Sequence, residues 1–223
     1  MEIFSYIITA LAAYLLGSIP TGYLVAKAKG IDIRSVGSGN MGATNVFRIL
    51  GKAAGIFVLL VDALKGFVAV AVIVNSYPEL QGAFPEIFGT TGPGNNQLRE
   101  HLGIVAGVAA ILGHNYTCFL KFKGGKGIAT TAGVLIALAP VAFLIVLAIF
   151  LLILFATRYV SLGAVVAAFC LPFAVWISRG TLTMVGVMAA LGALAIYKHK
   201  ANIKRLLNGT ENRFGKTKFE AEK

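Results

Sequence analysis

The segment 35–48 combines the residue types with which proteins bind phosphate groups. Three glycines, two serines, two asparagines and a threonine fall within residues 35–45. Glycine allows positive φ and close backbone approach, so successive N–H groups can face one anion. Arg48 could add a bidentate contact to phosphate. A flexible connecting loop would have a similar composition, and both interpretations stay open. The candidates are Ser35, Gly37, Ser38, Gly39, Asn40, Thr44, Asn45 and Arg48.

A second candidate anion-binding segment covers residues 113–127. Lys123 and Lys126 stand on either side of two glycines, immediately before a helix predicted from Ile128. Ammonium groups and the N–H groups of a helix N-terminus both attract phosphate. A lysine by itself could be an interfacial anchor, but the glycines around Lys126 favour an anion site. The candidates are Lys123, Gly124, Gly125 and Lys126.

Two further pairs of polar residues lie within or next to apolar segments. His114 and Asn115 precede the lysine–glycine loop; a lone helical histidine is usually structural, but here it is a candidate for orientation or acid–base work. Asp62 and Lys65 lie three residues apart on one face of an apolar segment. They form either a functional pair or a mutually neutralising structural one.

The last polar cluster follows the final apolar segment. His199 and Asn202 are three residues apart and share a helical face, and Glu211 follows them. An interfacial amphipathic helix that meets anionic lipid headgroups would explain the neighbouring cations. It explains His199, Asn202 and Glu211 less well, and these three are therefore candidates for a substrate site.

The composition indicates an integral membrane protein built from helices. Hydrophobic residues make up 57% of the chain, charged residues 13%, and the mean hydropathy is +0.82. Soluble domains contain about 25% charged residues. The net charge of +11 does not indicate nucleic-acid binding, because basic residues also mark the cytoplasmic side of membrane proteins.

Five segments are apolar over a length that crosses a bilayer: 3–26, 53–74, 102–120, 160–177 and 182–197. A sixth, 128–155, is longer and contains Pro140 near its middle. Sixteen of the 20 basic residues lie in 27–52, 121–126 and 198–223, which the positive-inside rule places in the cytoplasm. An outside N-terminus and an inside C-terminus require an odd number of crossings, so we predict that 128–155 is two helices. Six crossings, with the tail outside, is the competing model.

The predicted fold is therefore all-α: a polytopic transmembrane bundle of seven helical elements, forming one domain over residues 1–223. The first apolar segment is predicted to be a retained helix and not a signal peptide, since it lacks a basic start. The segment 75–100, rich in Gly, Pro and Asn, is predicted to be a solvated external loop.

These clusters, in this order, resemble the acyl-phosphate-dependent glycerol-3-phosphate acyltransferases of bacterial membranes, the PlsY family. The resemblance covers the whole chain apart from 75–100, which is longer than the family usually has. One departure is Thr117, where the family often has proline, and we expect it to alter the local helix geometry. The matching residues include Ser35, Gly37, Ser38, Gly39, Asn40, Gly42, Thr44, Asn45, Arg48, Asp62, Lys65, Gly66, Gly113, His114, Lys123, Gly124, Gly125, Lys126, Gly127, His199, Asn202, Arg205, Gly209, Thr210 and Glu211.

The resemblance implies a reaction. A fatty acyl group passes from acyl phosphate to the 1-hydroxyl of glycerol 3-phosphate, which gives lysophosphatidic acid and inorganic phosphate. It also implies a multi-pass protein of the bacterial cell membrane with a site facing the cytoplasm. No cofactor, metal or nucleic acid is implied, and the oligomeric state stays open.

The resemblance also implies roles for the candidate residues. Ser35, Arg48, His114, Lys126, His199 and Asn202 are the expected catalytic residues. The residues expected to bind substrate are Gly37, Ser38, Gly39, Asn40, Thr44, Asn45, Lys65, Asn115, Lys123, Gly124, Gly125 and Glu211. Positioning and electrostatics would carry most of the catalysis, because no Ser-His-Asp arrangement is present.

The acceptor of the hydroxyl proton is either His114 or the phosphate of acyl phosphate. Substrate assistance is favoured because no carboxylate is expected beside His114, since Asp62 lies on another helix and is predicted to pair with Lys65. A phosphate or anion transporter is the alternative function. It would be expected to show inverted repeats and broken helices at the bilayer midplane. This sequence suggests no repeats, and its charges gather on one side, with only Asp62 and Lys65 deep in a span.

Overall fold

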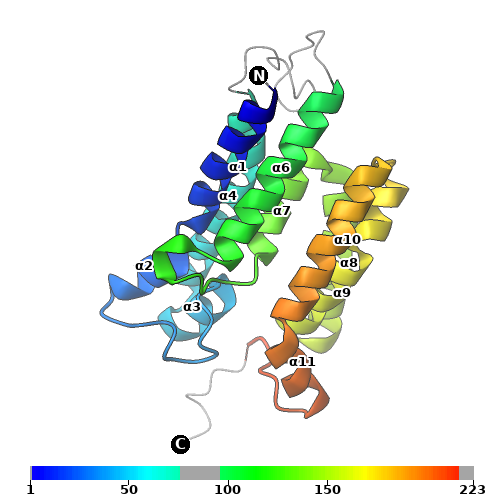
Figure 1. The fold of residues 1–223 in the computed structure, drawn as a ribbon. Coiled ribbons are helices and arrows are strands. Elements are labelled where there is room, and N and C mark those ends of the chain that lie inside the picture. The colour runs from blue at the N-terminus through cyan, green and yellow to red at the C-terminus, as the bar shows by residue number, and fades with distance from the viewer. Residues whose placement is uncertain (1, 76–95, 216–223) are drawn as a thin grey trace, which may run out of the picture. The chain divides into compact units, whose positions relative to one another are not determined.

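The computed structural model describes residues 2–75 and 96–215, and the regular secondary structure in these ranges is helical (Figure 1). The predicted all-α class is confirmed. The chain divides into two compact units, Met1–Leu138 and Ala139–Lys223.

The described residues of the first unit form seven helical segments. Helix α1 packs mainly on α6, and α4 packs mainly on α7 (Figure 1). The segments are α1 (Glu2–Ser18), α2 (Thr21–Lys27), α3 (Ala43–Leu50), α4 (Lys52–Asn75), α6 (Asn96–Asn115), the 3₁₀ turn η2 (Cys118–Leu120) and α7 (Ile128–Leu138).

Glycines allow these helices to approach closely. A Cβ at Gly17 of α1 would meet the backbone of Ala110 in α6, and one at Gly133 of α7 would meet the backbone of Ala63 in α4. Small residues at such crossings are typical of membrane helices, whose association relies on van der Waals packing. The outward faces carry large apolar side chains such as Leu60, 62% exposed, as expected for contact with lipid.

The second unit consists of α8 (Pro140–Thr157), α9 (Val160–Ile177), α10 (Leu182–Lys198) and α11 (Lys200–Leu207). Helix α9 packs against both α8 and α10. The chain bends by 58° between α10 and α11, so the short basic helix leaves the direction of the apolar one.

The predicted division of 128–155 at Pro140 is confirmed. Helix α7 ends at Leu138, Ala139 is non-helical (φ −150°, ψ 67°), and Pro140 begins α8. Proline disfavours the helical conformation in the preceding residue and is well suited to the first helical position. The halves are 11 and 18 residues long, against the predicted 12 and 16.

The number of complete crossings is smaller than the number of predicted elements. In the described ranges, five helices are long and apolar enough to cross a bilayer, or six if the bent α10–α11 pair counts as one. Helix α7 rises only about 17 Å, against a hydrocarbon core of about 30 Å. The inside–outside orientation therefore stays a prediction.

Two predicted loops contain helix. Residues 43–50 of the segment 27–52 form α3, which carries Thr44, Asn45 and Arg48. Residues 96–100, predicted as the end of an external loop, are the first turn of α6, and residues 76–95 of that loop lie outside the described residues.

Candidate functional site

Buried apolar side chains hold the glycine-rich segment in place. Ile33 and Val46 are fully buried and Met41 is 4% exposed. They pack with Ala26 of α2 and Val58 of α4 in one apolar cluster. The segment is thereby anchored on both sides of residues 34–40, most of which stay at the surface.

Asn45 shapes this segment from the inside. Its side chain, 2% exposed, accepts a hydrogen bond from Ser38 N at 2.9 Å and donates to Val36 O at 3.1 Å and Ile33 O at 3.3 Å. Gly37 has φ +60°, and a Cβ there would collide with the Asn45 amide oxygen. A larger residue at position 37 would therefore both strain the backbone and disrupt this amide.

Several backbone N–H groups that the sequence predicted to face an anion instead have hydrogen-bond partners within the glycine-rich loop. Ser35 N donates to Asp32 O at 3.0 Å, Gly39 N to Val36 O at 3.0 Å and Gly42 N to Asn40 Oδ1 at 2.8 Å, in addition to the bond from Ser38 N. These donors stabilise the loop's own shape. The predicted anion cradle of free N–H groups is therefore not seen at these four positions.

Asp32 and Arg34 form a fixed ion pair at the edge of this loop. Arg34 Nε and Nη2 donate to the two Asp32 carboxylate oxygens at 2.9 and 2.7 Å, and the guanidinium lies 4.8 Å from the Tyr23 ring centroid. Ser35 Oγ donates to Asp32 O at 2.9 Å. The hydrogen bonds from Arg34 lower the pKa of the Asp32 carboxyl from 3.8 to about 2.

The second loop is tied to the end of α1. The hydroxyl of Thr117, fully buried, donates to Ser18 O at 2.6 Å and accepts from Phe119 N at 3.2 Å. Thr117 has φ −63° and ψ 128°, values that proline also adopts. The expected change relative to proline-bearing relatives stays a prediction, and the Thr117 hydroxyl adds an anchor to α1.

The glycines of this loop lie against the end of α6. Gly125 N donates to His114 O at 2.9 Å, and a Cβ on Gly125 would collide with His114 Nε2. Gly127 has φ +78°, and a Cβ there would lie 2.8 Å from Asn115 Oδ1. These glycines are needed for close packing around His114 and Asn115, whatever they bind.

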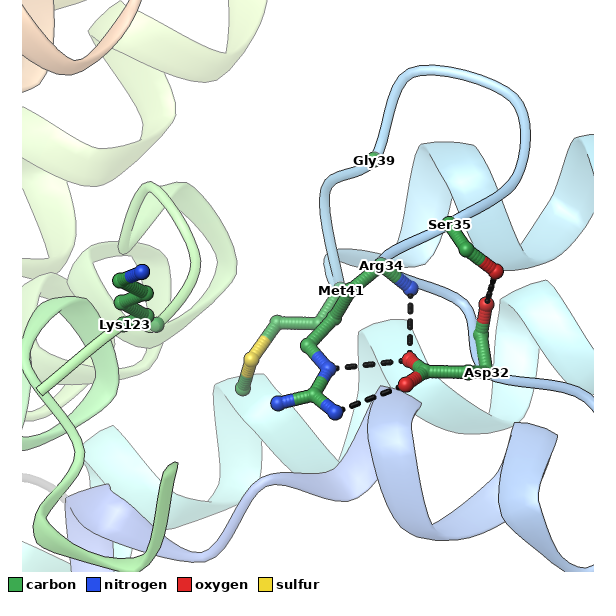
Figure 2. A pocket seen from close by; sticks show the side chains of 7 residues that line it. Asp32, Arg34, Ser35, Gly39, Met41 and Lys123 are labelled. Atoms are coloured by element: carbon green, nitrogen blue, oxygen red, sulfur yellow. Dashed lines mark hydrogen bonds and ion pairs between the residues drawn. The ribbon is translucent and has the colours of Figure 1, made fainter. Parts of the chain in front are cut away.

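A cavity of about 490 Å³ joins the two loops. Figure 2 shows Lys123 on one side of it and the Asp32–Arg34 pair on the other. The full lining is Asp32, Arg34, Ser35, Gly39, Met41, Lys123 and Gly124. The structure thus brings Ser35 and Gly39 together with Lys123 and Gly124. Among the described residues Arg48, in the last turn of α3, and Lys126 do not line this cavity.

Asp62 and Lys65 are almost fully buried and form the predicted pair. Lys65 Nζ lies 2.7 Å from Asp62 Oδ1 and donates to Ile19 O at 2.8 Å and Gly17 O at 3.3 Å. Lys65 thus neutralises Asp62 and binds carbonyl groups at the end of α1. These contacts place the Lys65 ammonium on protein groups, whereas the resemblance implied that Lys65 binds substrate.

The expectation that no carboxylate lies beside His114 is wrong. Asp62 Oδ1 is 3.8 Å from His114 Nδ1, and the two side chains are 3% and 5% exposed. The packing of α4 on α6 brings the two residues together although they are on different helices.

In the second unit, Glu211 binds several side chains of the polar cluster that follows the final apolar segment. It accepts hydrogen bonds from Asn202 Nδ2 at 2.8 Å, Ser161 Oγ at 3.0 Å and Arg205 Nε at 2.7 Å. His199 is 3% exposed, and its Nδ1 lies 2.7 Å from Ala195 O. The Glu211 carboxylate therefore positions Asn202 and Arg205, as a buried acceptor at the junction of α9 and α11.

The sequence alone did not single out Asp32 or Ser161. The signal for Asp32 was an Asp-x-Arg spacing directly before the glycine-rich loop, which lets both side chains meet on one side of a turn. Ser161 lies at the start of α9, far from Glu211 in the sequence. The two meet only because the chain turns back towards α9 after α11.

The chain matches known proteins over nearly its full length. A family model described as Glycerol-3-phosphate acyltransferase matches residues 7–209. The glycerol-3-phosphate acyltransferase of Geotalea daltonii is 46% identical over 210 residues, 94% of this chain and 98% of that protein. The one of Clostridioides difficile is 45% identical and covers 98% of this chain and 100% of its own length.

The fold matches solved structures as well. A crystal structure of PlsY (YgiH), an integral membrane glycerol 3-phosphate acyltransferase, in its glycerol 3-phosphate form is 39% identical, with a TM-score of 0.80. That match covers 95% of this chain and 96% of the other. The lysophosphatidic acid form is 38% identical with a TM-score of 0.78. The protein is thus a multi-pass integral membrane acyltransferase. It belongs to the glycerol-3-phosphate acyltransferase family.

The Asp32–Arg34 pair generates a test by titration. A carboxyl whose pKa is lowered on folding stabilises the folded state at pH values above its unfolded pKa, near 3.8. This stabilisation is lost as the pH falls through the folded pKa of about 2. We expect Arg34→Gln to return the Asp32 pKa towards 3.8. The chain has two aspartates, so a ¹³Cγ-aspartate label followed by NMR, with Asp32→Asn for assignment, measures it. A wild-type Asp32 that titrates near 3.8 would contradict the pairing.

Proposed function

We propose that the protein transfers a fatty acyl group from acyl phosphate to the 1-hydroxyl of glycerol 3-phosphate. The products are lysophosphatidic acid and inorganic phosphate, and the reaction is the first step of phospholipid synthesis. The observation that carries the proposal is the cavity that Ser35 and Gly39 line together with Lys123 and Gly124. Related structures with glycerol 3-phosphate and lysophosphatidic acid support the acceptor and the product.

Acyl phosphate suits this protein because it is both lipid-like and activated. Its carbonyl carbon is part of a mixed anhydride, and the hydroxyl oxygen of glycerol 3-phosphate attacks it. The new C–O ester bond forms and the bond between the carbonyl carbon and the phosphate oxygen breaks. The hydroxyl proton passes to the phosphate of acyl phosphate, which leaves as inorganic phosphate. Negative charge grows on the carbonyl oxygen and on the leaving phosphate, so cations held nearby stabilise the transition state.

The site residues take roles that follow from these charges. Lys123 pairs with a substrate phosphate from the cavity wall, where Ser35 contacts the reacting groups. Arg48 and Lys126, which do not line the cavity, are proposed to pair with the phosphates from outside this lining. His199 and Asn202, the latter held by Glu211, bind glycerol 3-phosphate. Gly37, Ser38, Asn40, Thr44 and Asn45 supply the loop that holds Ser35, and Gly124, Gly125 and Asn115 do the same for Lys123.

We propose that residues 1–223 form one acyltransferase domain. The family model supports this, since its match over residues 7–209 spans both units. Each unit also holds part of the predicted constellation, with Ser35 and Lys123 in the first and His199 and Asn202 in the second.

The donor is tested with purified protein in detergent, glycerol 3-phosphate, and either acyl phosphate or acyl-CoA. We expect lysophosphatidic acid and stoichiometric inorganic phosphate from acyl phosphate and no product from acyl-CoA. Mass spectrometry of the lipid and a phosphate-release assay measure both products. Transfer from acyl-CoA at a comparable rate would contradict the proposed donor.

Lys121→Gln is the matched control for Lys123→Gln in this assay. Both lysines are exposed and belong to the same loop, but only Lys123 lines the cavity. Loss of a charge-assisted bond to phosphate costs about 1.5–3 kcal/mol, so Lys123→Gln should lower kcat/KM about tenfold or more. Equal activities of the two variants would show that the cavity is not the site of the reaction.

We also propose that the N-terminus is outside and that the site faces the cytoplasm. The distribution of basic residues supports this orientation, with 16 of 20 in the three segments assigned to the inside. With seven crossings Ser178, between α9 and α10, is outside, and with six it is inside. Lys29, between α2 and α3, is inside in both models.

Single cysteines test the orientation in a background with Cys118→Ala and Cys170→Ala. We expect an impermeant thiol reagent to label Ser178→Cys in intact cells, and to label Lys29→Cys only after permeabilisation. Protection of Ser178→Cys until permeabilisation would establish the six-crossing model instead.

A further inference from the structure

We propose that His114 is a positioning residue: held beside Asp62, it sets the place of the loop 123–127 and thereby of Lys123 in the cavity. The inference rests on the proposed function and assigns His114 a role other than proton acceptor. Its basis is the buried contact of one imidazole with a carboxylate on one side and with a glycine backbone on the other.

The loop side of His114 leaves no spare space. Gly125 N donates to His114 O at 2.9 Å, and a Cβ on Gly125 would meet Nε2 of the ring. A Cβ on Gly124 would meet the carbonyl oxygen of His114. Backbone and ring of one residue therefore define where two consecutive glycines lie, next to Lys123.

The opposite side of the ring faces a fixed charge. His114 Nδ1 lies 3.8 Å from Asp62 Oδ1, close to the carboxylate but longer than a hydrogen bond. Asp62 is itself held by Lys65 at 2.7 Å, and Lys65 binds carbonyl oxygens of Gly17 and Ile19. This series of contacts links the end of α1, helix α4 and the end of α6, and it fixes one orientation of the His114 ring.

The burial of His114 argues against direct proton transfer. The side chain is 5% exposed, and among the described residues the cavity lining does not include it. A general base must reach within about 3 Å of the proton that it takes, directly or through one water. Asp62 and Gly125 occupy the surroundings of the two ring nitrogens, so the phosphate of the substrate is the better placed acceptor.

A larger side chain at position 125, combined with a smaller one at position 114, tests the inference. Gly125→Ala should impair turnover because its methyl group collides with the His114 ring. His114→Ala removes that ring, so the double variant should recover activity relative to Gly125→Ala, by about tenfold. Gly124→Ala is the control, because its methyl group meets the His114 carbonyl, which His114→Ala leaves in place.

Kinetic constants separate positioning from proton transfer. A general base contributes about 10²–10⁴-fold to kcat. We expect His114→Ala to keep kcat within about tenfold and to raise the KM of whichever substrate phosphate Lys123 holds, acyl phosphate or glycerol 3-phosphate. Loss of kcat by about 10²-fold or more at unchanged KM would overturn the proposal.

A second pair of variants keeps the test decisive if His114→Ala does not fold. His114→Gln fills space beside Gly125 without an ionisable ring, and Asp62→Asn removes the carboxylate charge at nearly constant volume. Both should raise the same KM, and their effects should not be additive, because they act through one contact. Additive effects, or a large fall in kcat for His114→Gln alone, would overturn it. A wild-type protein without any transfer would instead count against the proposed function.

Discussion

An ammonium and a carboxylate, each nearly inaccessible to solvent, lie 2.7 Å apart on helix α4: Lys65 and Asp62. Burying either charge by itself would be costly, and removing one partner of such a pair typically destabilises a protein by about 3–5 kcal/mol. The pair therefore persists only where its other contacts are also satisfied. Lys65 reaches the carbonyls of Gly17 and Ile19 at the end of α1, and Asp62 faces His114 at the end of α6.

The contacts of Asp62 and Lys65 with the ends of α1 and α6 determine the geometry of one wall of the predicted site. The ring of His114 abuts Gly125, and the loop that contains Gly125 carries Lys123 to the cavity. The opposite wall is held differently, by buried Ile33 and Met41 and by the Asn45 amide. Buried side chains thus hold both loops in place, which suits catalysis by positioning and electrostatics.

The sequence predicted those features that depend on local chemistry. Pro140 divided 128–155 because proline constrains the residue before it, and Asp62 met Lys65 because residues three apart share a helical face. Features set by tertiary packing escaped prediction. The contact of Asp62 with His114 spans 52 positions of sequence, and the filling of the glycine loop by Asn45 depends on the unpredicted helix α3. The cavity lining of Asp32 and Arg34 likewise requires the two loops to be side by side.

Amide hydrogen exchange in Lys65→Met tests most directly whether the buried pair holds the site. The substitution keeps the length of the side chain but leaves the Asp62 charge unpaired. We expect exchange to accelerate at the end of α1 and in residues 121–127 by about tenfold or more, while α8, α9 and α10 of the second unit keep their wild-type rates. Wild-type exchange rates at residues 121–127 would show that the loop holds its place without the buried pair.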